Sequence, residues 1–306
     1  MTCPAARSLA TKGCLDLVLF TALTGLQLSM LMYMLAVGLT LIFGLMNVLN
    51  LAHGAFYTLG AYAGYVIAKN SGSFWLALML GPLVPLLGGA LFQRYVLQPF
   101  SESGRSAHID LALLTFGLLF ATAGTVEVVF GPQYLTVELP SSLRGGIAIF
   151  GFDFPLYRLF IIGLGLTCAA GLWLVLEKTL IGATIRAGVD DEAMVRAMGI
   201  NIRWVFALVF GAGAGLAGLA GVVAAPVLSI YSTMGIGIVV LTFVVVALGG
   251  LGNVKGSFYA AILVGMVDAF VQTYWPDVHM FALYVLLIVI MAVKPSGLFA
   301  RPVRLA

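Results

Sequence analysis

A short polar segment separates two apolar runs in the first fifth of the chain. The segment GLMNVLNLAHGAFYTLGAY, residues 44–62, carries Asn47, Asn50, His53 and Gly54. Asparagine side chains hydrogen-bond to nearby backbone groups and therefore resist continuous helix. Non-helical backbone at membrane depth is tolerated only where it is buried in protein or lines a cavity. These four residues are candidates for the wall of a transport path, although His53 also fits a buried structural histidine with a hydrogen-bonded ring.

A second segment, GGLGNVKGSFYAA at residues 249–261, shows a similar order of residues. Asn253 and Gly256 stand before a Ser-Phe-Tyr sequence, much as Asn47 and Gly54 stand before Ala-Phe-Tyr. Paired glycine-interrupted segments in two halves of a chain are typical of transporters built from repeats, with the path between them. The match predicts an internal duplication with Asn253 and Gly256 on the path, and a chance match is the alternative.

Residues 182–204 form the longest polar stretch with a helical pattern. Acidic residues suit the first turn of a helix, a basic residue suits the last turn, a glycine suits the position beyond it, and small or methionine side chains share one face. These residues are Asp190, Asp191, Glu192, Ala193, Met194, Arg196, Ala197, Met198 and Gly199. So small a face cannot stabilise an isolated helix in water. We expect a short helix, capped by Asp190, that another protein covers; the alternative, a helix lying on the membrane, conflicts with three adjacent acids.

A glycine-rich apolar run follows at residues 205–226. Gly211, Gly215, Gly218 and Gly221 give it a face of small residues. Small residues let helix backbones approach closely in lipid, where van der Waals packing drives association. We expect this run to be a packing helix.

Catalytic and metal-binding patterns are absent from the sequence. It contains no G-x-x-x-x-G-K-[ST] phosphate loop, so the chain is not expected to hydrolyse ATP by itself. No nucleophile–base or paired-carboxylate arrangement stands out. The three histidines are far apart and have no cysteine or carboxylate at ligand spacing, which argues against a metal site. Two acidic residues, Glu127 and Asp268, lie within or near apolar runs, but proton coupling requires a relay, and a local partner for each is the simpler expectation.

Composition places most of the chain in lipid. Hydrophobic residues make up 62% of the 306 residues and charged residues 9%, against about 25% charged in an ordinary soluble domain. About nine apolar runs approach the roughly 20 residues needed to span a bilayer, and eight to ten spans is the expected range. We therefore expect one all-α transmembrane domain over residues 1–306, with discontinuous helices and no β-barrel. The runs are residues 17–43, 52–68, 74–97, 110–130, 155–176, 203–227, 236–251, 256–275 and 279–293.

Positive charge predicts the topology. Basic residues in residues 98–109, in 178–204 and in the tail 294–306 place these segments on the cytoplasmic side, so loop 131–154 faces outward. Nine full spans with a cytoplasmic C-terminus would put the basic N-terminus outside. Either one segment is re-entrant or the N-terminus departs from the charge rule. The first apolar run is too long for a signal peptide and is expected to be retained as a helix.

The sequence resembles the membrane permeases of bacterial branched-chain amino acid ABC transporters, in the first of their two permease types. The resemblance covers nearly the whole chain. It is carried by GLTLIFGLMNVLNLAHGAFYTLGAY (residues 38–62), RAGVDDEAMVRAMGIN (186–201), VVVALGGLGNVKGSFYAAILVG (244–265) and KPSGLFA (294–300).

This resemblance implies a transport subunit in the bacterial inner membrane. It implies four kinds of partner: membrane lipid, a second homologous permease, two cytoplasmic ATPases that use ATP and Mg²⁺, and a periplasmic binding protein. The helix at residues 190–198 would then dock on an ATPase. The cargo would be a hydrophobic amino acid, with urea or short amides as the alternative. A stand-alone ion-coupled transporter and a membrane-embedded enzyme are further alternatives; nucleic acid is not an expected partner, because the charges form no basic patch.

Overall fold

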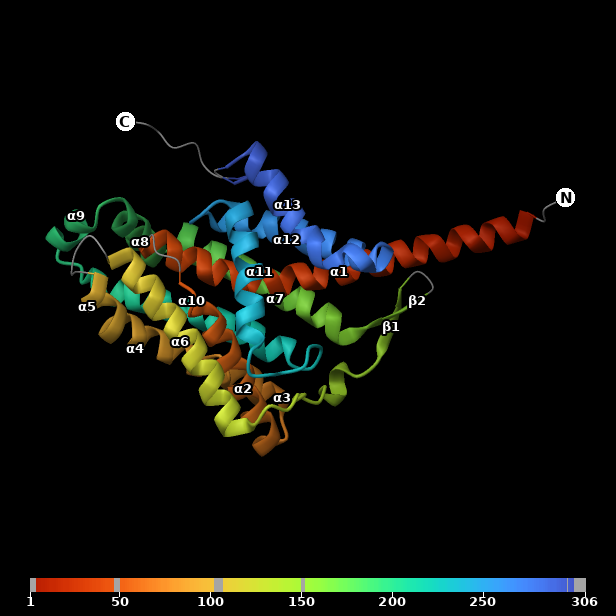
Figure 1. Ribbon diagram of the computed structural model, residues 1–306, viewed down its shortest axis with the longest axis horizontal. Coiled ribbons are helices and arrows are strands. Elements are labelled where there is room, and N and C mark those ends of the chain that lie inside the picture. The colour runs from red at the N-terminus through yellow and green to blue at the C-terminus, as the bar shows by residue number, and fades with distance from the viewer. Residues whose placement is uncertain (1–3, 47–49, 102–106, 150–151, 296, 300–306) are drawn as a thin grey trace.

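The computed structural model describes residues 4–46, 50–101, 107–149, 152–295 and 297–299, and in them the chain is a bundle of helices (Figure 1). The only sheet in these ranges is a two-stranded hairpin, β1 with β2. The longer elements are α1 (Pro4–Met46), α2 (His53–Ser71), α4 (Leu83–Phe92), α6 (Ala107–Phe130), α7 (Leu156–Lys178), α8 (Leu180–Asp190), α10 (Ile202–Ala224), α11 (Met234–Gly249), α12 (Val254–Tyr274) and α13 (His279–Val293). The short elements are α3 (Phe74–Leu80), η1 (Gln93–Leu97), α5 (Gln98–Ser101), η2 (Ser141–Leu143), β1 (Gly146–Ile149), β2 (Phe152–Pro155), α9 (Glu192–Ala197) and η3 (Pro276–Val278).

Six stretches of the described chain are long and apolar enough to cross a membrane. They are Asp16–Gly44, Phe74–Phe100, Ile109–Phe130, Leu156–Lys178, Ile202–Ala224 and Val254–Tyr274. Two shorter apolar helices, Met234–Gly249 and Phe281–Val293, accompany them. Together with α2, these stretches cover the nine apolar runs of the sequence, and the run at residues 74–97 is divided among α3, α4 and η1. The expected all-α, multi-pass bundle is confirmed.

Helix α2 starts inside the bundle. His53, the first residue of α2, places its Nε2 atom 2.8 Å from the backbone oxygen of Leu35, in the body of α1 and well before its end at Met46. Helix α2 therefore starts beside the C-terminal third of α1 rather than beyond its end. The polar segment of the sequence is a helix break at depth, as the asparagine pattern predicted.

Helix α10 lies at the centre of the bundle, packed against α1, α2 and α4. Its approach to α1 brings backbones together at Gly38 and Gly213. A Cβ atom added to Gly38 would lie 2.5 Å from the Gly213 oxygen, closer than real Cβ atoms come to other heavy atoms. Glycine at both positions is therefore a condition of this crossing.

The two ends of the bundle carry different features. The end of α7 and the start of α12 meet in an ion pair between Glu177 and Lys255, 2.9 Å apart, close to α8 and α9. Leu298 joins the same end through its backbone N–H, which donates to the Leu248 oxygen at 2.9 Å. The start of α1 lies at the opposite end, where the Phe20 ring contacts the ring of Phe154 on β2. In Figure 1, α9 and the hairpin are accordingly far apart.

Helix α1 starts at the end opposite α9, and residues 297–299 lie at the α9 end. If α9 is cytoplasmic, the basic N-terminus therefore lies on the outer side, against the charge rule.

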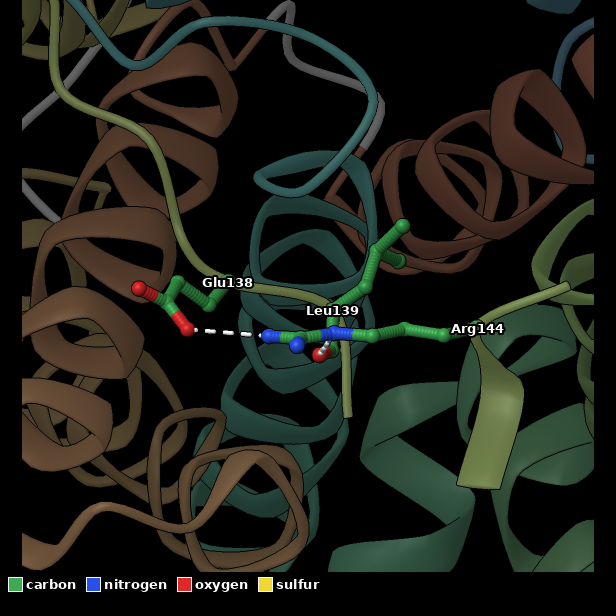
Figure 2. Close-up of polar contacts among 3 residues, drawn as sticks. All are labelled: Glu138, Leu139 and Arg144. Carbon is green, nitrogen blue, oxygen red and sulfur yellow. Dashed lines mark hydrogen bonds and ion pairs between the residues drawn. The ribbon is translucent and has the colours of Figure 1, made fainter. Parts of the chain in front are cut away.

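A structured loop covers the end opposite α9. The Arg144 side chain holds it by donating from Nε to the Leu139 oxygen at 2.9 Å and by pairing with Glu138 at 2.9 Å, as Figure 2 shows. The loop is also joined to the α10–α11 connection, because Leu135 and Ile230 exchange two backbone hydrogen bonds of 2.9 and 2.8 Å. The loop expected to face outward thus lies away from α9.

Candidate functional site: a buried helix break and an exposed short helix

The break before α2 is organised by its own side chains. Asn50 accepts a hydrogen bond at its Oδ1 from the Ala52 N–H, 3.1 Å away, and so forms the turn that leads into α2. The backbone N–H of Leu51, the residue between Asn50 and Ala52, donates to Thr115 Oγ1 on α6 at 3.2 Å. The polar groups freed by the break are thereby partly satisfied inside the bundle. Asn47 lies outside the described residues.

Two polar atoms at the break have no hydrogen-bond partner within the described part of the chain. His53 is fully buried, and because a carbonyl oxygen can only accept, its Nε2 carries the proton toward Leu35. His53 Nδ1 is then an unused acceptor, and Asn50 Nδ2 is an unused donor. A buried polar atom without a partner costs about 1–3 kcal/mol. The site therefore has the hydrogen-bonded histidine of one interpretation, together with two polar atoms whose hydrogen-bonding capacity is unused in the described chain.

Close backbone contacts surround these atoms. A Cβ atom on Gly38 would lie 2.9 Å from His53 Cε1, so α1 passes close to the histidine ring at this glycine. Gly54 faces the backbone of Gly235 at the start of α11. In this arrangement the break is closed by helix packing on two sides.

The second polar segment occupies another place in the bundle. Asn253 caps α12 by accepting from the Gly256 N–H at 3.1 Å, and its Nδ2 donates to the Phe299 oxygen at 2.6 Å. Gly256 packs against the backbone of Gly249, at the end of the bundle near α9. The structure thus does not bring Asn253 and Gly256 to the break that holds Asn50, His53 and Gly54.

The two acidic residues near apolar runs each have a local partner. Asp268 Oδ1 lies 2.9 Å from His279 Nε2, between α12 and α13. Glu127 Oε2 accepts from Ser232 Oγ at 3.3 Å, between α6 and the α10–α11 connection. The two pairs are on different elements, as expected for residues with separate local roles.

The polar stretch at residues 182–204 forms two helices. Helix α8 runs to Asp190, and Asp191 then adopts an extended backbone with φ −151° and ψ 95°. Asp191 Oδ1 accepts from the Met194 N–H at 2.9 Å and so caps α9. The sequence analysis placed the cap at Asp190, one position too early: Asp190 is the last residue of α8, and a capping Asp typically has the extended backbone that Asp191 adopts.

Helix α9 ends as its sequence predicted. Gly199 has φ +83°, a left-handed conformation that side chains with a Cβ rarely adopt. The Gly199 N–H donates to Arg196 at 3.0 Å and the Ile200 N–H to Val195 at 3.4 Å. This pair of bonds is the Schellman motif, which closes the helix and fixes the chain direction into α10.

One side of α9 is packed and another side is bare. Val195 is buried, whereas Met194 and Met198 are 61% and 70% exposed. Arg196 and Ala197 are also exposed, and the side chains of Asp190, Glu192 and Ala193 are not described. Helix α9 is therefore held against the bundle while it presents two methionine side chains outward.

The glycines of α10 divide between two neighbours. Gly211 and Gly215 face Leu86 on α4, with added Cβ atoms 2.7 Å from its oxygen and 3.1 Å from its Cβ. Gly218 faces α4 and α2, and Gly221 faces the backbone of Tyr57 on α2. Sequence reasoning missed Gly213 and its partner Gly38, although the run Gly-Ala-Gly-Ala-Gly already placed a glycine there.

These features define a class: a helical, multi-pass membrane protein with a broken helix at its centre and an exposed amphipathic helix at one end. The chain belongs to the family described as the permease component of the branched-chain amino acid transport system, whose model matches residues 21–291. It is a transport subunit of that family rather than an enzyme.

Curated relatives agree with this assignment. The high-affinity branched-chain amino acid transport system permease protein LivH of Salmonella typhimurium is 24% identical over 297 residues, covering 91% of this chain and 94% of the relative. BraD of Pseudomonas aeruginosa, a permease protein of the same description, is 24% identical over 296 residues with the same coverage. LivM of Escherichia coli is 26% identical over 297 residues, covering 89% of this chain and 68% of the relative. No solved structure matches the chain.

Proposed function

We propose that this chain is a membrane-spanning subunit of an ATP-driven importer that moves branched-chain amino acids across the bacterial inner membrane. The family assignment and the relatives named LivH and BraD support the cargo. In this proposal a periplasmic binding protein delivers the amino acid. Two cytoplasmic ATPases bind ATP and Mg²⁺, and this chain binds no cofactor. A second permease completes the path, and the similarity to LivM as well as LivH supports a non-identical one.

The observation that carries the proposal is the exposed face of α9. Met194 and Met198 lie on a short helix capped at both ends, outside the six long apolar stretches. Methionine side chains adapt to irregular apolar surfaces, so they suit a socket on a moving partner. Such a face points to an ATPase that covers it. This end of the bundle, with residues 297–299, is then cytoplasmic.

The packing gives α9 a route to the buried break. Helix α9 leads directly into α10, and Ile202 at the start of α10 packs close to Gly188 of α8. Further along α10, Gly213 packs against Gly38 of α1, and Gly38 lies close to the His53 ring. A displacement of α9 by nucleotide-driven closure of the ATPases would thus tilt α10 and open the crossing beside His53.

The proposed path passes the helix break. Opening α1 from α10 and α2 from α11 would expose Asn50 Nδ2 as a donor and His53 Nδ1 as an acceptor. An amino acid offers a matching carboxylate and ammonium group. Asn50 Nδ2 and His53 Nδ1 would also suit urea or a short amide, because these solutes have both donor and acceptor groups. The family and its relatives favour the amino acid.

The experiment is uptake of labelled leucine, isoleucine, valine, urea and acetamide by vesicles containing the full chain with its genomic neighbours: the ATPases, the second permease and the binding protein. We expect ATP-dependent uptake of the three amino acids. Met194→Glu with Met198→Glu should abolish uptake and stimulation of the ATPases, whereas replacement of both by leucine should preserve them.

Two results contradict the proposal. One is accumulation of leucine against a gradient by this chain alone, without ATPase subunits, which would indicate a secondary transporter. The other is undiminished uptake by the double glutamate variant, which would remove α9 from the coupling contact.

A further inference from the structure

We infer that a depression at the end of the bundle opposite α9 is an entry site for the zwitterion of an apolar amino acid. The site rests on the proposed function, because it assumes that the chain conducts such a solute. It lies between the C-terminal ends of α2 and α6, which meet at the bottom of Figure 1, and it is bordered by the loop after α6.

The size of the depression suits a small solute. Its volume is about 400 Å³, within the range of sites that bind small molecules. One side of its lining is apolar and consists of Val66 on α2, Val129 and Phe130 on α6, and Leu135 in the following loop. A branched aliphatic side chain would remove these surfaces from water.

The other side of the lining is polar and carries one charge. Lys69 is its only charged residue, and the amides of Asn70 and Gln133 lie beside it. The Lys69 ammonium sits over the Tyr65 ring, 5.6 Å from its centre, and no ion pair engages it within the described ranges. A lysine with amide neighbours and no acid among the described lining residues is suited to the carboxylate of an amino acid. The ammonium group of the same molecule can then donate to an amide oxygen.

One face of α2 runs inward from the depression. Tyr65, Tyr62, Thr58 and Gly54 follow one another at intervals of three or four residues, the spacing that puts side chains on a single helix face. This face leads from Lys69 to the buried break.

An unsatisfied group marks the next step inward. The Tyr62 ring packs on Phe130, with centroids 4.8 Å apart, and its hydroxyl is buried without a hydrogen-bond partner within the described part of the chain. The Glu127 carboxylate, which accepts from Ser232, is close enough to interact electrostatically with Tyr62. A solute ammonium leaving the depression would therefore meet an acid and an unused hydroxyl.

The test measures occupancy without transport. The full chain, with Cys3, Cys14 and Cys168 changed to alanine, receives Val129→Cys in the lining, at a residue 67% exposed, and is reconstituted in vesicles. A neutral, membrane-impermeant thiol reagent then modifies the cysteine with and without L-leucine. At a leucine concentration of about three times the dissociation constant, three quarters of the sites are filled and modification is about fourfold slower.

Three controls separate recognition from a general effect. Leucinol, which lacks the carboxylate, should leave the rate unchanged. Lys69→Met should abolish protection by leucine, and Lys69→Arg should retain it. Tyr134→Cys, next to the site but not in its lining and at a residue 73% exposed, should be modified at one rate under all conditions.

The outcomes distinguish this site from the importer proposal. Protection that depends on Lys69 and on the carboxylate supports the site even if vesicles show no ATP-driven uptake. No protection by leucine, equal protection by leucinol, or protection that survives Lys69→Met overturns the site, and does so whether or not the complete transporter imports leucine.

Discussion

Replacing Gly38 by alanine tests the close contact between α1 and α10 beside the proposed path. The added methyl group would lie 2.5 Å from the Gly213 oxygen and 2.9 Å from His53 Cε1, whereas ordinary contacts are 3.4–4 Å. The obstructing atom is backbone and cannot rotate away, so α1 and α10 must separate by roughly 1 Å, at a cost of about 1–3 kcal/mol for overpacking. That cost corresponds to a roughly 5- to 150-fold shift between packed and separated helices.

The matched control for Gly38→Ala is Gly44→Ala on the same helix. A methyl group there meets Gly252 Cα at 3.5 Å, an ordinary contact. Both substitutions gain up to about 1 kcal/mol from the higher helix propensity of alanine, so their difference isolates the overpacking. Thermal unfolding of the detergent-purified chain, followed by size-exclusion chromatography, should show Gly38→Ala melting well below Gly44→Ala. Equal melting temperatures would refute the close crossing.

Three further substitutions probe other contacts of the fold. Gly199→Ala places a Cβ at φ +83° and should lower ATPase stimulation by weakening the end of α9, at a cost of about 1 kcal/mol, with Gly199→Asn affected less. Arg144→Ala should leave the melting temperature nearly unchanged, because its Glu138 partner is 92% exposed. It should nevertheless speed proteolysis of the loop after α6, and an unchanged cleavage rate would contradict the role of the Arg144 contacts in holding that loop. Thr40→Val removes one partner of the buried 2.6 Å Thr40–Ser257 hydrogen bond and should cost about 1–3 kcal/mol, whereas Thr40→Val with Ser257→Ala should recover part of the loss.

The number and position of the helices were predictable because each apolar run has the length of a span. Eight of the nine runs each correspond to one helix, including the short Met234–Gly249 and Phe281–Val293, whereas residues 74–97 are divided among α3, α4 and η1. Run length reports how far a helix extends, but it carries no information about the depth at which the helix starts. The start of α2 beside Leu35 is fixed by contacts between residues far apart in the chain, and only the structure supplies them.

Helix α9 was predictable because the residues that start and end it are close together in the sequence. Its glycine end depends on residues 195–200, which are neighbours in the sequence. The entry depression was not predictable, because Lys69 and Gln133 come together only when α2 and α6 end at the same place. The one-residue error at the cap of α9 has a similar origin: a second helix, α8, which the sequence analysis did not predict, includes Asp190 and places the start of α9 at Glu192.

The two polar segments show why similar local sequences acquire different roles. Asn50 and Asn253 each accept a backbone N–H at 3.1 Å, so both build the turn that starts a helix. Their remaining amide groups differ: Asn253 donates to the Phe299 oxygen near the end of the bundle, whereas Asn50 Nδ2 is buried without a partner in the described chain. An amide that is already satisfied gains nothing from a passing solute, but an unsatisfied one recovers a buried hydrogen bond when a solute arrives. Depth in the bundle, rather than the local motif, therefore favours Asn50 and His53 over Asn253 as the residues that meet the cargo.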